Sequence, residues 1–379
     1  MNPATEHAID RVAEQVGEPP TGHTPAPVGE PRPGTDPAER PLVSVIIPNH
    51  NYARTLPLCL RAVAEQSYPR VEIVVVDDGS TDNSPRIAEE FPCTLVRTSN
   101  AGVSAARNTG VRHSKGSILF FLDSDIALRP DAVERAVDLL ESDPDIGFVC
   151  GNYDDVPLID DGWVERYKVL HGHHWRRRTA GDVRAAYFSI GAMPRETYER
   201  AGPLDETLRD TEDVEYGARL APLARVVLDP RIVGRHDDDD RLGVLLRKQY
   251  RRSVPLVALF ADRERARPGL SDTAHQPLAV TGTALIGAGL LGAARRPRAG
   301  AAVAGVGLGL FTVAERGMLR LIRDRAGTRA LPAMAALHLM THVTTGAAAL
   351  VGVGRWALSP AFRRRYRNPG AASPAGEGR

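Results

Sequence analysis

The sequence has few cysteines and lacks the common glycine-rich nucleotide-binding motifs. Its three cysteines, Cys59, Cys93 and Cys150, lie far apart in 379 residues without a CxxC pair, so neither a disulfide framework nor a cysteine zinc site is indicated. No GxGxxG follows the first apolar run and no GxxxxGK(S/T) occurs anywhere, which removes the central feature of a dinucleotide-binding Rossmann fold and of a P-loop. The chain also lacks an excess of positive or negative charge. The chain has 48 Lys and Arg against 47 Asp and Glu, so its composition makes no case for a nucleic-acid partner.

The two ends of the chain have little apolar content. Residues 1–40 are rich in Pro, Gly, Glu and Thr, and such a composition cannot bury enough apolar surface to order itself, so we expect a disordered leader. Charged residues such as Glu6, Asp10 and Arg11 interrupt this segment, so we do not expect a secretory signal peptide. We expect a basic, disordered tail at residues 359–379.

Short apolar runs alternate with helical spacing after the leader. The hydrophobic content of 42% supports a sizeable core. Alternation of strand and helix at short intervals predicts an α/β fold with a doubly wound, mostly parallel sheet, in a domain at residues 41–262. The strands are expected at residues 42–47, 71–76, 94–97, 117–122, 146–149, 225–229 and 232–234, and the helices at residues 55–66, around 87–88, at 100–113 and from 130 onward.

Two carboxylates follow the most apolar of these runs. Residues 117–122 predict a strand that is buried on both faces, and Asp123 and Asp125 stand at its carboxyl end. Residues two apart in extended chain point to the same side, so both carboxylates can reach one point in space. In open α/β sheets ligands bind at the carboxyl ends of strands, and Mg²⁺ or Mn²⁺ prefers such oxygen ligands. The pattern predicts a divalent cation site, although Asp-Ser-Asp by itself is also typical of an ordinary turn.

Four motifs occur in a fixed order along this domain: SVIIPNHN at residues 44–51, VVDDGSTD at 75–82, NAGVSAARNTG at 100–110 and FLDSD at 121–125. In this order they resemble the family 2 glycosyltransferases of the GT-A fold. Together with DTEDVEY at residues 210–216, the resemblance covers roughly residues 41–250. It implies metal-dependent transfer of a sugar from a nucleotide-diphosphate donor to a lipid-linked or envelope-glycan acceptor, with inversion at the anomeric carbon.

The resemblance also implies the residues that bind the donor. Pro48 and His50 match the loop that frames the nucleotide base, and Asp78 matches the acid that contacts the base. Arg107 matches a basic position near the nucleotide, although an arginine on an exposed helix face is the ordinary alternative. Asp77, next to the base-contacting acid, is interpreted as turn chemistry alone.

The metal ligands follow from the same resemblance. Asp123 matches the first acid of the DxD motif, which contacts ribose or metal, and Asp125 matches the metal ligand. His236 matches a position at which family members place a ligand to metal or diphosphate, although a lone loop histidine often has no such role. The expected cofactor is therefore Mg²⁺ or Mn²⁺.

On the acceptor side, Asp213 matches the catalytic base, with Glu212 beside it. The alternative is that both are first-turn acids favoured by the dipole of the helix that they open. Gln249 and Arg252 fit part of a QxxRW motif on the acceptor and diphosphate side, but Ser253 replaces the tryptophan. That departure argues against a processive polysaccharide synthase.

The remaining sequence predicts a membrane region. Three runs at residues 278–294, 299–314 and 331–354 are nearly uncharged, and only the third clearly reaches the about 20 residues that a spanning helix needs. Because the runs lack a polar face, we expect residues 263–358 to be helical and membrane-embedded; a soluble Ala-Gly-rich helical domain is the alternative. The protein is then expected at the cytoplasmic membrane, with its catalytic domain facing the cytoplasm.

Other features leave alternatives open. The histidines of HGHH at residues 171–174 are interpreted as a solvated face of a polar helix or loop in preference to a metal site. A catalytically silent nucleotide-sugar-binding or membrane scaffold protein could keep the same fold. A nucleotidyltransferase would share the sheet and the metal but would release pyrophosphate.

Overall fold

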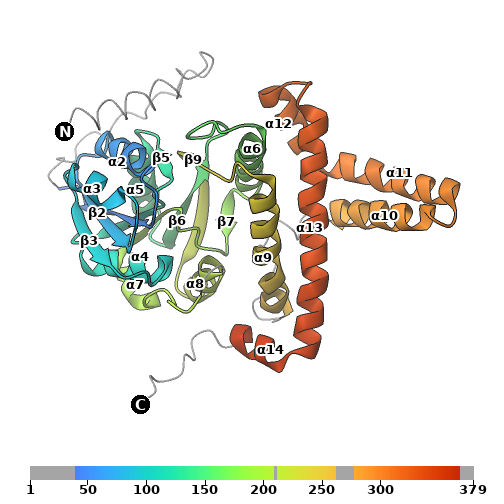
Figure 1. Ribbon diagram of the computed structural model, residues 1–379. Helices are drawn as coiled ribbons and strands as arrows, with labels where there is room; N and C mark the ends of the chain where they lie inside the picture. The colour runs from blue at the N-terminus through green and yellow to red at the C-terminus, as the bar shows by residue number, and fades with distance from the viewer. Residues whose placement is uncertain (1–38, 209–210, 262–276, 368–379) are drawn as a thin grey trace. The chain divides into compact units, whose positions relative to one another are not determined.

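The computed structural model describes residues 39–208, 211–261 and 277–367, which form two compact units (Figure 1). The first unit contains the chain up to Asp160 and Arg176–Asp238, and the second contains Asp161–Trp175 and the chain from Asp239 onward. The predicted domain boundary at residue 262 and nearly all of the predicted leader lie outside the described residues.

The first unit is built on a nine-stranded sheet with the order β3-β2-β1-β4-β8-β6-β9-β5, in which β7 also pairs with β9. Strands β1 to β4 run parallel, and β8 is antiparallel to both β4 and β6. The predicted mostly parallel α/β sheet is therefore confirmed. The strands are β1 (Val43–Asn49), β2 (Val71–Asp78), β3 (Thr94–Thr98), β4 (Ile118–Leu122), β5 (Ile126–Leu128), β6 (Ile146–Tyr153), β7 (Gly181–Val183), β8 (Ile190–Pro194) and β9 (Arg225–His236).

Alternation along the central strands fills both faces of this sheet, because successive side chains of a strand point to opposite sides. Val45 of β1 joins a core with side chains of α2, α3 and α5, whereas Ile46 joins a core with side chains of α4, α7 and α8. The helices of this unit are α2 (Leu56–Ala64), α3 (Ser84–Glu89), α4 (Val103–Arg112), α5 (Ala132–Ser142), α7 (Arg195–Ala201) and α8 (Glu212–Leu220).

Two local expectations differ from the structure. The short edge strands expected at residues 225–229 and 232–234 form one strand, β9, which pairs with β5, β6 and β7. The pairing of β9 with β6 shifts register between Cys150 and Asn152, and this shift lets β9 continue through its irregular middle. No strand or helix is assigned above to the stretch after residue 151, but it contains the 16-residue helix α6 (Trp163–Arg178).

The second unit is helical. Besides part of α6, it contains α9 (Leu242–Ala261), α10 (Pro277–Ala293), α11 (Pro297–Ala314), α12 (Arg316–Ala326), α13 (Leu331–Leu358) and α14 (Pro360–Arg367). Helices α10, α11 and α13 coincide with the three apolar runs of the sequence. Helices α11 and α13 are long and apolar enough to cross a membrane, and α10 is shorter. The tail expected to be disordered from residue 359 begins with helix α14 (Pro360–Arg367).

Glycines set the close packing of α10 against α11, which lie side by side in Figure 1. A Cβ added at Gly289 would lie 2.4 Å from the Ala304 nitrogen, and one at Gly300 would lie 2.4 Å from the Ala293 nitrogen. The backbones therefore approach as closely as small residues permit, which is a packing mode of helices in lipid.

The histidines at residues 171–174 do not form a simple solvated face. The His171 ring lies 6.0 Å from the Tyr167 ring and 5.7 Å from the His338 ring, centroid to centroid, inside the second unit. Burial and the nearby positive charge of Lys168 hold the pKa of His171 well below its ordinary value of 6.5. The interpretation as a solvated face is thus wrong for His171.

Candidate active site

The parallel half of the sheet brings the predicted donor residues to one edge. Asn49, the last residue of β1, lies in register with Asp77 of β2. Asp123 follows the last residue of β4, which is the other neighbour of β1. Because parallel strands end at the same edge, the loops after β1, β2 and β4 lie together at one edge of the sheet, where ligands bind in open α/β sheets. Pro48, which pairs with Val76, is buried just before this edge.

Asp78 holds the loop that leads into α4. One carboxylate oxygen accepts from the Thr98 hydroxyl at 2.9 Å and from the Ala101 amide at 2.9 Å, and the other accepts from the Gly102 amide at 2.7 Å. An ionised carboxylate offers about four lone-pair sites, so three donors leave capacity for one more. Asp78 thus organises the start of α4 and can still accept from a ligand.

His50 is held in one tautomer by its partners. Its Nδ1 lies 2.8 Å from the carbonyl oxygen of Asp78, and because a carbonyl only accepts, Nδ1 carries the proton. Nε2 therefore presents its lone pair to the side-chain amides of Asn51 at 3.2 Å and Asn100 at 3.3 Å. The ring is oriented by the same loops that carry the predicted base-contacting acid.

Arg107 joins three elements at the site. It is buried, with 4% exposure, so the alternative of an exposed helix face is wrong. Its guanidinium donates to Asp123 at 2.8 Å and to Glu212 at 3.3 Å. Burial opposes the charge, but attraction from the two carboxylates outweighs it and raises the pKa of Arg107 above its ordinary value. The guanidinium of Arg107 therefore links Asp123, after the end of β4, to Glu212, the first residue of α8.

Asp125 faces His236 across the β5–β9 ladder, where Ile126 pairs with His236. The Asp125 Oδ2 atom lies 3.7 Å from Nε2 of His236, whose Nδ1 lies 3.3 Å from Asp238. The ring also stacks on Tyr153 with centroids 4.5 Å apart. Burial acts to lower the pKa of His236, but attraction from Asp125 leads the opposing effects and holds the pKa well above 6.5.

The carboxylate of Asp125 fits a cation ligand. Within the part of the chain that the structure describes, its Oδ1 atom is buried and has no hydrogen-bond partner. A buried polar atom without a partner calls for an explanation such as an ion or a water. The carboxylate oxygen of Asp125 suits Mg²⁺ or Mn²⁺, and the imidazole nitrogen of His236 beside it favours Mn²⁺ of the two.

Asp213 is the second residue of α8, directly after Glu212. Its Oδ1 accepts from the Val214 amide at 2.9 Å, and its carbonyl accepts from the Ala186 amide at 3.0 Å. Since Glu212 and Asp123 share the guanidinium of Arg107, the first turn of α8 lies beside the DxD segment. The structure therefore brings Asp213, the predicted base, into the neighbourhood of Asp123.

Gln249 and Arg252 lie elsewhere in the chain, on α9 of the second unit. The side-chain amide of Gln249 donates to the Thr345 hydroxyl at 2.9 Å, and Arg252 is exposed. Their acceptor-side role stays a prediction.

Sequence reasoning missed two neighbours of the metal-binding histidine candidate. Tyr153 stacks on His236, and the carboxylate of Asp238 faces its Nδ1. The available signal for Asp238 was the acid run at residues 237–240 directly after the histidine. Nothing in the sequence pattern distinguishes Tyr153, because strand pairing alone brings the end of β6 beside the end of β9.

Known proteins share this fold and its motifs. The family Glycosyl transferase family 2 matches residues 44–193. Glycosyltransferase AglE of Haloferax volcanii is 31% identical over 220 residues, which cover 56% of this chain and 71% of AglE. The putative glycosyltransferase EpsH of Bacillus subtilis is 29% identical over 204 residues, covering 50% of this chain and 58% of EpsH.

A solved structure shows the same fold. The mannosyltransferase PcManGT from Pyrobaculum calidifontis superposes with a TM-score of 0.52 at 23% identity, covering 94% of this chain and 95% of PcManGT. The fold and the site define a GT-A glycosyltransferase. The chain belongs to glycosyltransferase family 2, as the sequence motifs predict.

Proposed function

We propose that this glycosyltransferase uses a nucleotide-diphosphate sugar and a divalent cation, Mg²⁺ or Mn²⁺, and transfers the sugar with inversion to a lipid-linked or envelope-glycan acceptor. The observation that carries the proposal is the carboxylate of Asp125: its buried Oδ1 has no hydrogen-bond partner among the described residues, and its Oδ2 lies 3.7 Å from Nε2 of His236. PcManGT, which has this fold, was solved with GDP-Man and Mn²⁺, and this supports a donor and a metal of the same kind.

Asp125 and His236 would hold the cation, whose chemistry when bound is to neutralise negative charge on the leaving diphosphate. His236 binds a metal only as neutral imidazole, so it must give up the proton that Asp125 stabilises. Arg107 keeps Asp123 oriented toward the ribose side of the donor by its 2.8 Å hydrogen bond. Pro48, His50 and Asp78 would frame and contact the base.

Asp213 would act as the general base. It accepts the proton of the acceptor hydroxyl while that oxygen attacks the anomeric carbon from the face opposite the leaving group. A single displacement of this kind inverts the configuration. The first turn of α8 holds Asp213 in place through the carbonyl that accepts from Ala186.

Two helices support a membrane location for the second unit. Helices α11 and α13 have the length and composition of spanning segments, and α10 packs closely against α11. We infer that they embed the protein in the cytoplasmic membrane with the first unit facing the cytoplasm, where nucleotide sugars are available. Carbonate extraction at alkaline pH checks this, because an embedded protein stays in the membrane pellet.

The activity is tested with the full chain in detergent, incubated with UDP-, GDP- and dTDP-sugars and Mn²⁺ or Mg²⁺, with and without a lipid-phosphate acceptor. We expect one donor to release nucleoside diphosphate, and we expect chelation or Asp125→Asn to abolish the release. Release of pyrophosphate would identify a nucleotidyltransferase instead. No release with folded protein and a membrane extract as acceptor would favour a binding protein without turnover.

A further inference from the structure

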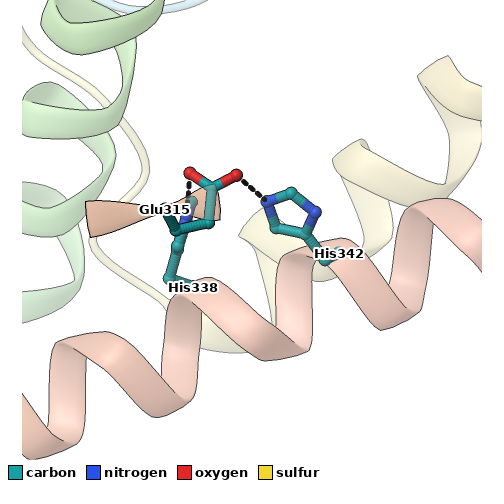
Figure 2. Close-up of side chains that lie close together, drawn as sticks. All are labelled: Glu315, His338 and His342. Carbon is teal, nitrogen blue, oxygen red and sulfur yellow. Dashed lines mark hydrogen bonds and ion pairs between the residues drawn. The ribbon is translucent and has the colours of Figure 1, made fainter. Parts of the chain in front are cut away.

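A second group of potential metal ligands lies in the helical unit. Glu315, in the link between α11 and α12, faces His338 and His342, which stand one turn apart on α13. Figure 2 shows the carboxylate between the two imidazole rings, with a different oxygen directed at each ring. One ligand atom from each residue lies within 4.8 Å of the others. Spacing of four residues on a helix places both histidines on the same face.

The cluster is buried in the second unit. Glu315 is 1% exposed and His338 is 2% exposed. The Phe311 ring covers both histidines, with centroids 5.6 Å from His338 and 5.2 Å from His342. A carboxylate out of contact with water is costly unless a positive charge accompanies it. A cation beside the two histidines would offset this cost.

A chain of hydrogen bonds identifies the atom of His338 that faces the carboxylate. The Thr341 hydroxyl donates to the carbonyl of His338 at 2.8 Å, so its oxygen accepts from the Tyr167 hydroxyl at 3.0 Å. The Tyr167 hydroxyl has only one proton, so its oxygen accepts from Nδ1–H of His338 at 2.9 Å. The lone pair of a neutral His338 is then on Nε2, which lies 3.1 Å from the Glu315 carboxylate.

Two acceptors this close need a positive centre between them, either a proton or a metal ion. A proton shared by Glu315 and His338 leaves His342 unexplained, because its Nε2 lies 3.9 Å from Glu315, too long for a hydrogen bond. Ligands at about 2.0 Å from a tetrahedral metal are separated by roughly 3.3 Å. The observed separations are near that value, at 3.1 Å from His338 Nε2 to Oε2 of Glu315 and 3.9 Å from His342 Nε2 to Oε1, so each histidine faces a different oxygen of the carboxylate. A metal ion accounts for both histidines.

We propose that Glu315, His338 and His342 bind one divalent transition-metal ion of the zinc class, with Tyr167 as a positioning residue. Two imidazoles and one carboxylate suit zinc and its neighbours, whereas Mg²⁺ prefers sites made wholly of oxygen. Metal-bound histidines almost always donate their other N–H to a second group, and Tyr167 fills that place for His338. The ion joins the link between α11 and α12 to α13 and α6, so it is structural for this unit.

This site does not depend on the proposed donor or cation at Asp125, and the experiment separates the two. The full chain is purified in detergent through a tag without histidine, and bound zinc is measured by mass spectrometry for wild type and for Asp125→Asn. We expect one zinc per chain in both. The double variant His338→Gln/His342→Gln is expected to lose it, and the exposed His113→Gln is the matched control that keeps it.

Cobalt keeps the test independent of how the variants fold. Wild-type protein is stripped with a chelator, checked for helical content by circular dichroism and titrated with Co²⁺. We expect the visible absorption of a four-coordinate cobalt site, and Tyr167→Phe should weaken binding about 10- to 100-fold. Absence of these bands in folded wild-type protein overturns the proposal. Equal zinc in wild type and a folded double variant overturns it as well, and leaves a shared proton between His338 and Glu315.

Discussion

Arg107 donates a hydrogen bond to Asp123 at 2.8 Å, and the same guanidinium reaches Glu212 at 3.3 Å. The planar guanidinium of an arginine can donate to two carboxylates at once through different N–H groups, whereas the ammonium of a lysine concentrates its charge at one atom. The orientation of the DxD segment and the placement of α8 therefore depend on one side chain. This relationship predicts that donor use and stability respond together to changes at residue 107.

Arg107→Lys is expected to keep the charge but lose one of the two contacts, which lowers kcat for nucleoside diphosphate release. Arg107→Met removes both and should destabilise the fold by about 2–3 kcal/mol, because two half-buried carboxylates lose a charged donor. Arg112→Lys, at the exposed end of the same helix, is the control. Thermal unfolding and release assays check this, and wild-type kinetics for Arg107→Lys would contradict it.

Asp213→Asn is expected to lower kcat about 10²- to 10⁴-fold, because the amide cannot accept the acceptor proton. Donor affinity should change little, since the proposed partner of Asp213 is the acceptor hydroxyl and not the donor. The measurement is donor binding by calorimetry beside the release assay. Val214→Ala, at the next position of α8, is the control for damage to the helix. Transfer at the wild-type rate in Asp213→Asn would remove this residue from the mechanism.

Gly217 lets α8 approach the chain before β8. A Cβ at this position would lie 1.8 Å from the carbonyl oxygen of Arg184, so Gly217→Ala forces backbone to move. We expect a destabilisation of roughly 1–3 kcal/mol and a loss of activity through misplacement of Asp213. Gly243→Ala is matched, because a Cβ there meets nothing within 4 Å and alanine favours the helix. Equal melting temperatures for the two variants would refute the close approach.

Gly289 tests the packing of the α10–α11 hairpin. Gly289→Leu places a side chain against Ala304, whereas Gly287→Leu faces open space. We expect only the first variant to lower the melting temperature of the detergent-solubilised chain. If both variants behave alike, the glycine contact does not hold the hairpin together.

Glu72 predicts a pH dependence of stability. Burial acts to raise its pKa, but hydrogen bonds from the Ser44 hydroxyl and from the amides of Lys115 and Gly116 outweigh burial and hold the pKa below 4.5. The folded-state pKa is thus lower than the unfolded one. The stabilisation is fully present above the unfolded pKa, about 4.3, and is lost as the pH falls through the folded pKa.

The melting temperature of Glu72→Gln should therefore lie below that of wild type near neutral pH, and the difference should shrink as the pH falls below the unfolded pKa toward the lower folded pKa. Glu65→Gln, at an exposed position, serves as the control. A difference between wild type and Glu72→Gln that stays constant from pH 7 to pH 3 would show that ionisation of Glu72 is not the cause.

The sequence by itself determined the parallel core, the family and the donor-side candidates. These features are local: β-branched runs form strands, polar residues at their ends share one edge, and motif order carries the family resemblance. Pro48, His50, Asp78, Asp123 and Asp125 all belong to such strand ends. The three apolar runs likewise predicted α10, α11 and α13, because helix length and composition are read directly from the chain.

Only the tertiary structure decided which distant residues meet. The insertion of β8 between β4 and β6 and the bulged course of β9 bring His236 to Asp125, and no local spacing records those pairings. The sequence left open whether Arg107 lies near the nucleotide or on an exposed helix face, and its contacts with Asp123 and Glu212 exclude the exposed face. Glu315 and His338 lie in different segments of apolar character, and helix packing alone brings them together. Long-range packing creates these contacts, so a sequence pattern with local periods could not reveal them.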